Sequence, residues 1–254
     1  MSSAAASGAQ VAAPRKREAQ TLLVVGARGL GRELALHFGR RGWNVVCAAR
    51  TAADVGKLAG EVEAAGGVAL GTTADLQDPA TLRALCDAAI ARFLRIDLCV
   101  CAQTSGVPFG PRPLAELPPE LLARALAAYP QGTLNLLQAV APALRAQGEG
   151  TFIQIGTGSG LRPREGFGLH AAAQAALRAL LAVAAQELKP AGIHAAWLAI
   201  EGQIESEAAQ GYVQRHGLAK TLPPAAIAEA VAFLHAQPPR AWTHELSLRP
   251  SAAG

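Results

Sequence analysis

Three glycines near the start of the chain have the spacing of a phosphate-binding turn. Gly26, Gly29 and Gly31 follow the apolar run 22–25 and lead into a segment with helical periodicity. Glycines allow backbone amides to approach a ligand closely, and the first turn of a helix carries unpaired N–H groups. The pattern G-x-x-G-x-G therefore predicts that these glycines and Leu30 bind a pyrophosphate. The alternative is that Gly26 only serves a tight turn.

Two arginines lie beside this turn in the sequence. Arg28 is inside it, and Arg50 ends the next apolar segment, where a protein that binds NAD usually carries an acidic residue for the ribose diol. An arginine at that position can instead bind the 2′-phosphate of NADP(H). We therefore expect NADP(H) as the cofactor. NAD(H) is the alternative, and so is an interpretation in which both arginines are only solvated.

Apolar segments that alternate with amphipathic stretches must position these residues. The expected strands are 22–25, 44–49, 68–71, 97–101, 151–155, 193–199 and 244–248. The expected helices are about 30–41, 52–65, 79–94, 118–147, 169–188 and 224–236. This alternation predicts an α/β fold of the Rossmann type, a doubly wound parallel sheet of about seven strands with helices on both faces. We expect one domain over 21–254 and a disordered leader over 1–20.

Two of the expected helices have special features. Pro130 cannot donate a backbone hydrogen bond, so it should interrupt the helix 118–147 beside Tyr129. The segment 169–188 is so rich in alanine and leucine that more than one of its faces can be buried, against the sheet and against another subunit. We therefore expect a homodimer or a homotetramer.

Composition narrows the classes of function. The net charge is +4, part of which comes from the leader, and only 4% of the 254 residues are aromatic, so we expect no nucleic-acid partner. The four cysteines lie in apolar segments and the six histidines lack metal-ligand spacing, so neither a disulfide framework nor a metal site is expected. Without a signal sequence or an apolar run of about 18 residues, the protein is expected in the cytoplasm, not in a membrane.

The chain resembles the short-chain dehydrogenase/reductase family over about residues 21–250. The likeness rests on the glycine turn, on Arg50, and on the sequences A-D-L at 74–76 and I-D-L at 96–98. It implies that Asp75, with Leu76 beside it, contacts the adenine of the cofactor. A carboxylate at Asp75 also fits a strand end or a helix cap.

The segment 201–206 resembles the family's P-G-x-I-x-T sequence, which lies beside the nicotinamide carboxamide. Gly202, Ile204 and Ser206 match that sequence, so the resemblance implies that they bind the cofactor. Glu201 stands where the family has proline.

Two further segments depart from the family at the cofactor end. The glycine turn is one residue shorter than the family's T-G-x-x-x-G-x-G, and Val25 replaces its threonine. The sequence C-A-Q-T at 101–104 replaces the family's N-N-A-G, and it puts Gln103 beside the expected cofactor.

All four catalytic positions of the family carry other residues here. The family uses a tyrosine as acid, a lysine that lowers its pKa, a serine that orients the substrate oxygen, and an asparagine at a helix kink. His170 aligns with the tyrosine and Gln174 with the lysine; Thr157, with Ser159 nearby, covers the serine, and Tyr129 the asparagine. Histidine can act as acid or base near neutral pH and threonine keeps a hydroxyl, but glutamine carries no charge.

Three hypotheses follow from these residues. The first is an atypical NADP(H)-dependent oxidoreductase that acts on a carbonyl or alcohol of a small-molecule substrate, with His170 and Thr157 or Tyr129 taking part. The second is a catalytically silent relative that binds a nucleotide or serves in oligomerisation, in which His170 is only a helix residue. The third is a non-redox isomerase, cyclase or dehydratase that uses His170 as acid and base in the same cleft.

Overall fold

Seven parallel strands form the central sheet of the computed structural model, which describes residues 19–102, 106–108, 110–206 and 209–252. Their spatial order is β3-β2-β1-β4-β5-β6-β9. The strands are β1 (Thr21–Val25), β2 (Asn44–Ala49), β3 (Val68–Thr73), β4 (Leu98–Cys101), β5 (Gly150–Thr157), β6 (Ile193–Ile200) and β9 (Glu245–Leu248). The predicted doubly wound fold is confirmed. The leader over 1–18 and Gln103 lie outside the described residues.

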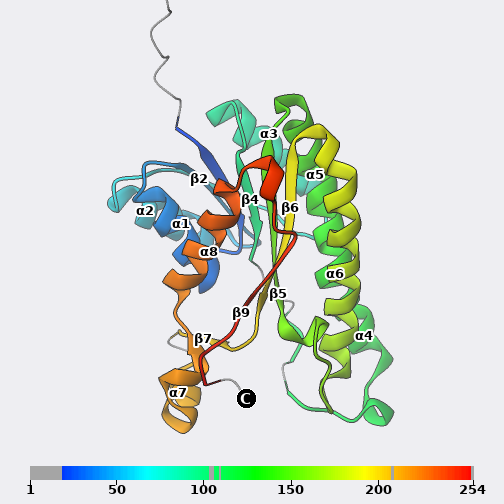
Figure 1. Cartoon of the computed structure of the whole chain (residues 1–254). Helices are drawn as coiled ribbons and strands as arrows, with labels where there is room; N and C mark the ends of the chain where they lie inside the picture. The colour runs from blue at the N-terminus through cyan, green and yellow to red at the C-terminus, as the bar shows by residue number, and fades with distance from the viewer. Residues whose placement is uncertain (1–18, 103–105, 109, 207–208, 253–254) are drawn as a thin grey trace, which may run out of the picture.

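Helices cover both faces of the sheet (Figure 1). One face packs against α1 (Leu30–Gly39), α2 (Ala52–Ala64) and α8 (Pro224–Ala236). The other packs against α3 (Pro79–Phe93), α5 (Gly132–Gln147) and α6 (Gly168–Leu188). Because both faces of the central strands are buried, these strands appear in the sequence as continuous apolar runs without polar alternation.

The predicted helix over 118–147 consists of three segments. The helix α4 (Pro119–Leu126) passes through one turn of π-helix, Ala127–Gln131, into α5. Pro130 lies inside that turn and has no N–H for the carbonyl four residues earlier, so the regular pattern cannot continue through it. The predicted interruption beside Tyr129 is thus present.

The carboxyl ends of the strands carry a small excursion that the sequence did not predict. It contains α7 (Gln210–His216) and a pair of two-residue strands, β7 (Gln203–Ile204) and β8 (Thr221–Leu222). In Figure 1 this excursion lies at the lower end of the molecule, beyond the tips of the sheet. Its residues lack a sustained apolar period, so the sequence gives no helix signal there.

By length and composition alone, one helix in the described part of the chain could cross a membrane, although polar residues such as Gln174 and Arg178 interrupt its apolar run. It covers Gly168–Ala191, with a mean hydropathy of 1.3, and half of it is buried inside the protein. Leu177, Leu181 and Ala184 on this helix belong to the core beneath the sheet. A core helix of this composition passes the same length test, so the cytoplasmic location stays a prediction.

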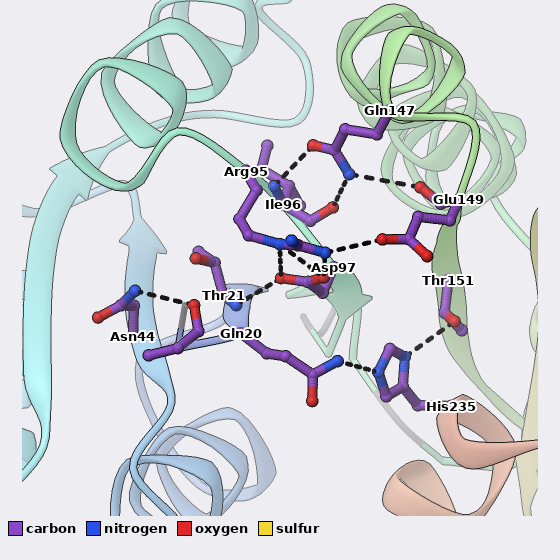
Figure 2. A network of polar contacts seen from close by, with 11 residues as sticks. Gln20, Thr21, Asn44, Arg95, Ile96, Asp97, Gln147, Glu149, Thr151 and His235 are labelled. Carbon is purple, nitrogen blue, oxygen red and sulfur yellow. Dashed lines mark hydrogen bonds and ion pairs between the residues drawn. The ribbon is translucent and has the colours of Figure 1, made fainter. Parts of the chain in front are cut away.

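The amino ends of three strands are joined by a buried carboxylate (Figure 2). Asp97 is 4% exposed and accepts a hydrogen bond of 2.8 Å from the backbone N–H of Thr21. Arg95 Nε lies 2.9 Å from both oxygens of Asp97, and Arg95 Nη2 lies 2.9 Å from Glu149 Oε1. The carbonyl of Asp97 also accepts the N–H of Thr151. The starts of β1, β4 and β5 are therefore fixed relative to one another.

His235 extends the same network from α8. Its Nδ1 is 2.9 Å from Thr151 Oγ1, and its Nε2 is 3.1 Å from the side-chain amide nitrogen of Gln20. The amide donates to Nε2, so the ring holds its proton on Nδ1 and is neutral. Burial lowers the pKa of His235, and the charge of Asp97 only partly opposes this.

We predict that the protein loses stability as pH falls from about 7.5 to about 5, and that His235 contributes to this loss. A folded-state pKa below the unfolded value of about 6.5 means that the contribution is present above that pH and disappears below it. Urea unfolding of the wild type and His235→Gln at both pH values should show a smaller loss for the variant. His216→Gln, a change of an exposed histidine, is the control. Equal losses for His235→Gln and the wild type would contradict the prediction.

Candidate active site

The predicted site residues follow the carboxyl ends of the strands, where parallel α/β sheets bind their ligands. The turn after β1 is held by two backbone bonds. The N–H of Gly26 donates to the carbonyl of Ala48, at 2.8 Å, and the N–H of Ala102 donates to the carbonyl of Val25, at 2.9 Å. The ends of β1, β2 and β4 are therefore held side by side at one edge of the sheet.

The glycine turn is open and leads directly into α1. Gly26 and Gly29 have φ of +122° and +54°, values that favour glycine. A Cβ on Gly31 would lie 1.8 Å from the carbonyl oxygen of Gly26, so only glycine allows the helix to approach the turn this closely. A Cβ on Gly29 would meet nothing within 4 Å, and no side chain caps α1. The shortened turn thus fits a pyrophosphate at the start of α1, which begins at Leu30.

The two arginines beside the turn have different surroundings. Arg28 has a side chain that is 83% exposed and lies 4.0 Å from Asp54, so it does not fill the turn. Arg50 is also exposed and lines a surface hollow together with Gln77 and Arg124. Arg124 belongs to α4, and nothing in the sequence placed it near the end of β2.

Asp75 is engaged in the turn that follows β3. Its Oδ1 accepts the N–H of Gln77 at 2.9 Å, and its own N–H donates to Thr81 Oγ1 at 3.0 Å. The cap of α3 is a different residue, Asp78. Leu76 is 2% exposed, so its side chain belongs to the core; the binding of the cofactor at Asp75 and Leu76 stays a prediction.

The segment expected beside the nicotinamide is tied to the end of the chain. A Cβ on Gly202 would lie 2.6 Å from Pro250 Cγ, so the two backbones approach closely there. Ile204 lies in β7, paired with Leu222 of β8. Ser206 follows as an exposed residue. The three predicted residues therefore lie on the excursion that leaves the sheet after β6.

Thr157 and Gln174 are brought into direct contact. Thr157 ends β5, and its N–H donates to Gln174 Oε1 at 3.0 Å. Gln174 lies on α6 and is 1% exposed. Thr157 Oγ1 is buried and has no hydrogen-bond partner in the described part of the chain. Because a buried hydroxyl without a partner is costly, this atom is the place where a substrate oxygen can complete the site.

His170 is buried beneath the segment that follows β4. It lies in the first turn of α6, is 5% exposed, and has its Nε2 at 3.4 Å from the carbonyl oxygen of Pro108. A carbonyl only accepts, so Nε2 carries the proton in this contact. Burial lowers the pKa of His170, and the bond to Pro108 partly opposes that change. The imidazole is therefore neutral at about pH 7.

Tyr129 and Ser159 complete the predicted catalytic set. Tyr129 lies in the π-helical turn, is partly buried, and packs against a small apolar cluster that includes Leu169 and Ala173 of α6. Ser159 lies in the short 3-10 turn Gly158–Gly160 that follows β5. No three histidine, cysteine, aspartate or glutamate side chains gather as a possible metal site within the described ranges.

Comparison with known proteins identifies the family. A family model described as short chain dehydrogenase matches residues 20–215. The chain belongs to the short-chain dehydrogenase family. The resemblance predicted from the glycine turn and the strand-end motifs is thus confirmed.

Relatives of known sequence or structure agree with this family. An uncharacterised oxidoreductase of Mycobacterium tuberculosis is 32% identical over 167 residues, 65% of this chain and 62% of the relative. The cyclohexanol dehydrogenase of a Rhodococcus species is 29% identical over 189 residues, 67% of this chain and 69% of the relative. A metagenomic short-chain oxidoreductase solved in complex with NADP has a TM-score of 0.73 and 26% identity, covering 92% of this chain and 98% of that one.

The match covers only part of several relatives. In three curated relatives of this chain, the aligned region spans 62%, 35% and 50% of the relative's own length. Membership of the family is therefore shown for the region that aligns with these relatives.

Glu201, which stands where the family has proline, is paired with two arginines. It follows β6, and its Oε2 accepts hydrogen bonds from the Arg162 side chain, including one of 3.1 Å from Nε. Arg249 Nε lies 3.8 Å from the same oxygen. In the sequence, Glu201 stands out only because the family has proline at this position. Nothing in the sequence predicts its contacts with the two arginines.

We predict that Gly31→Ala disrupts the glycine turn, because the added carbon would overlap the carbonyl oxygen of Gly26. The variant should lose roughly 1–3 kcal/mol of stability to urea and most of its affinity for the nicotinamide cofactor of the family. Gly56→Ala in α2 is the matched control, since its Cβ would meet nothing within 4 Å. It should gain about 0.5–1 kcal/mol and bind as the wild type does. Normal stability and binding in Gly31→Ala would refute this view of the turn.

Proposed function

We propose that this short-chain dehydrogenase family member is an NADP(H)-dependent oxidoreductase that acts on a carbonyl or alcohol group of a small molecule. The observation that carries the proposal is the open glycine turn at the uncapped start of α1. It lies at the same edge of the sheet as Thr157, whose hydroxyl is buried and without a partner in the described chain. The candidate nucleotide site and the candidate hydrogen-bond donor to the substrate therefore lie at the same edge of the sheet.

The chain's own residues suggest how the cofactor is held. The N–H groups of Gly26 and Gly31 donate within the chain, so the amides between them are the candidates for the pyrophosphate, and Arg50 is the candidate for the 2′-phosphate. Arg50 is exposed and takes part in no ion pair within the described residues. When bound, the nicotinamide supplies or accepts hydride. One relative of this fold was solved with NADP and another is named as NAD-dependent, so the choice of NADP(H) over NAD(H) rests on Arg50.

Thr157 and Gln174 are suited to orient the substrate oxygen. Gln174 Oε1 holds the backbone N–H of Thr157, which fixes the end of β5 against α6. The Thr157 hydroxyl can then donate to a carbonyl oxygen, whose negative charge grows as hydride arrives. His170 is the candidate for the proton transfer, because an imidazole can accept and release a proton near neutral pH.

A second candidate function is favoured by the contacts of His170 and Gln174. Gln174 is committed to the backbone of Thr157, and His170 lies against Pro108 with 5% of its surface exposed. Both residues thus have structural roles that need no substrate. These contacts favour a catalytically silent nucleotide-binding relative, which would bind NADPH without turning it over.

The proposal includes a homodimer or a homotetramer. Leu180 and Val183 on α6 are 36% and 51% exposed, and Leu134 on α5 is 37% exposed. Apolar side chains of this size on neighbouring helices are suited to a contact between subunits. Light scattering of the purified protein measures its mass directly.

We predict that Arg50→Asp weakens NADPH binding by about tenfold or more and leaves NADH binding unchanged or improved. The substitution replaces a charge-assisted hydrogen bond to the 2′-phosphate with repulsion, and NADH lacks that phosphate. Calorimetric titration with both nucleotides measures the two affinities. Arg83→Asp on the exposed side of α3 makes the same charge change elsewhere and should alter neither. Equal effects of Arg50→Asp on both nucleotides would rule out Arg50 as the reader of the phosphate.

We predict that Thr157→Val lowers kcat/KM for carbonyl reduction by about a hundredfold, the cost of losing one donor to the developing oxyanion. NADPH binding should stay unchanged, and Ser159→Ala should keep most of its activity. NADPH oxidation across a panel of ketones and aldehydes is the measurement. Wild-type rates in Thr157→Val would remove Thr157 from the reaction. Tight NADPH binding with no turnover of any carbonyl by the wild type would favour the silent relative.

A further inference from the structure

The carboxylate of Glu201 is built into the edge of the sheet where β5, β6 and β9 end. Its N–H donates to the carbonyl of Leu248 at 2.9 Å, a bond that a proline could not make. Its side chain is 7% exposed and lies over Gly158, where a Cβ would be 2.6 Å from Glu201 Cγ. Gly158 thus provides the space into which Glu201 extends toward the end of β5.

Two arginines from different segments meet at this carboxylate. Arg162 follows the 3-10 turn after β5, and Arg249 follows β9; both approach Oε2 of Glu201. Their side chains are 54% and 43% exposed, so most of their N–H groups are open to solvent. Each guanidinium has five N–H donors; the carboxylate accepts from two of them on Arg162, and it makes only an ion pair with Arg249. Two positive charges and one negative charge leave the cluster with a net charge of +1.

Two buried oxygens beside this cluster have no hydrogen-bond partner in the described chain. They are Glu201 Oε1 and Thr157 Oγ1. Both adjoin Gly158, since Thr157 precedes it in the chain and Glu201 packs over it. A buried acceptor without a donor costs free energy, so a ligand that brings a hydroxyl group to this point would be favoured. The arginines beside it favour an anionic group on the same ligand.

We propose that this cluster binds a small hydroxy acid. The carboxylate of the ligand lies on Arg162 and Arg249, and its hydroxyl donates to Glu201 Oε1 or meets Thr157 Oγ1. Only the role of this ligand as the redox substrate rests on the proposed function. The binding of the ligand needs no cofactor. Glu201 then binds the ligand by accepting its hydroxyl, and it also orients the two arginines.

The test compares ligands that differ in one group at a time. Lactate and 3-hydroxybutyrate carry both groups, propionate and butyrate lack the hydroxyl, and lactamide and 3-hydroxybutyramide lack the charge. Calorimetric titration of the full-length protein measures each affinity. At least one hydroxy acid should bind more tightly than both its deoxy acid and its amide.

Arg249→Gln is the decisive variant, because Arg162 remains on Glu201 and the buried carboxylate keeps a partner. It should weaken binding of the preferred hydroxy acid by about tenfold and leave its amide unchanged. Arg178→Gln is the matched control, since Arg178 makes a similar half-exposed ion pair with Glu245 and should have no effect. Thermal unfolding of each variant checks that it is folded.

Several outcomes would overturn the inference. The first is that the hydroxy acids bind no more tightly than their amides or deoxy acids. The second is that none of the compounds binds. The third is that Arg249→Gln and Arg178→Gln have equal effects. A separate titration with NADPH distinguishes this inference from the proposed function. NADPH binding without a preference for hydroxy acids defeats the inference alone. Hydroxy-acid binding without NADPH binding defeats the proposed function alone.

Discussion

The close approach of α1 to the end of β1 is the contact on which the rest of the site depends. Gly31 passes so near the carbonyl oxygen of Gly26 that any side chain would collide with it. This approach aims the start of α1 at the edge where all seven strands end. The buried Asp97 fixes the opposite ends of β1, β4 and β5. With one edge held rigidly, the loops at the other edge can vary in sequence without changing the sheet.

Local signals in the sequence were sufficient for most of the fold. The bounds of β2 and α8 were predicted to the residue, because apolar runs and helical periodicity are properties of short windows. Pro130 marked the interruption of its helix because a missing N–H acts at one position. The pair β7 and β8 and the helix α7 were missed, since their order comes from contacts with distant strands. The bond from Thr21 to Asp97, 76 residues apart, also had no local signal.

The residues of the candidate site also fall into those that local sequence predicts and those that it does not. The glycine turn was predictable because its conformation is encoded within six residues. The resemblance placed Gln174 and Thr157 in one site, but their contact, in which an amide oxygen accepts a backbone N–H, was not predicted. Arg162 and Arg249 could not be found at all, because they meet Glu201 only after β5, β6 and β9 are aligned. The single signal was a carboxylate where the family has proline.

The distribution of charge in the cleft follows from these substitutions. At the position that matches the family's lysine, Gln174 is neutral and 1% exposed, so this position supplies no cation to support proton transfer. Positive charge is found instead on Arg162 and Arg249, beyond Gly158 and on the side of β9. A cation beside a phenol lowers the pKa of that phenol. Half-exposed guanidinium groups instead attract a negatively charged group of a ligand. Under the proposed ligand site, the substitutions therefore shift the electrostatic contribution of the protein from proton transfer to the recognition of a charged ligand.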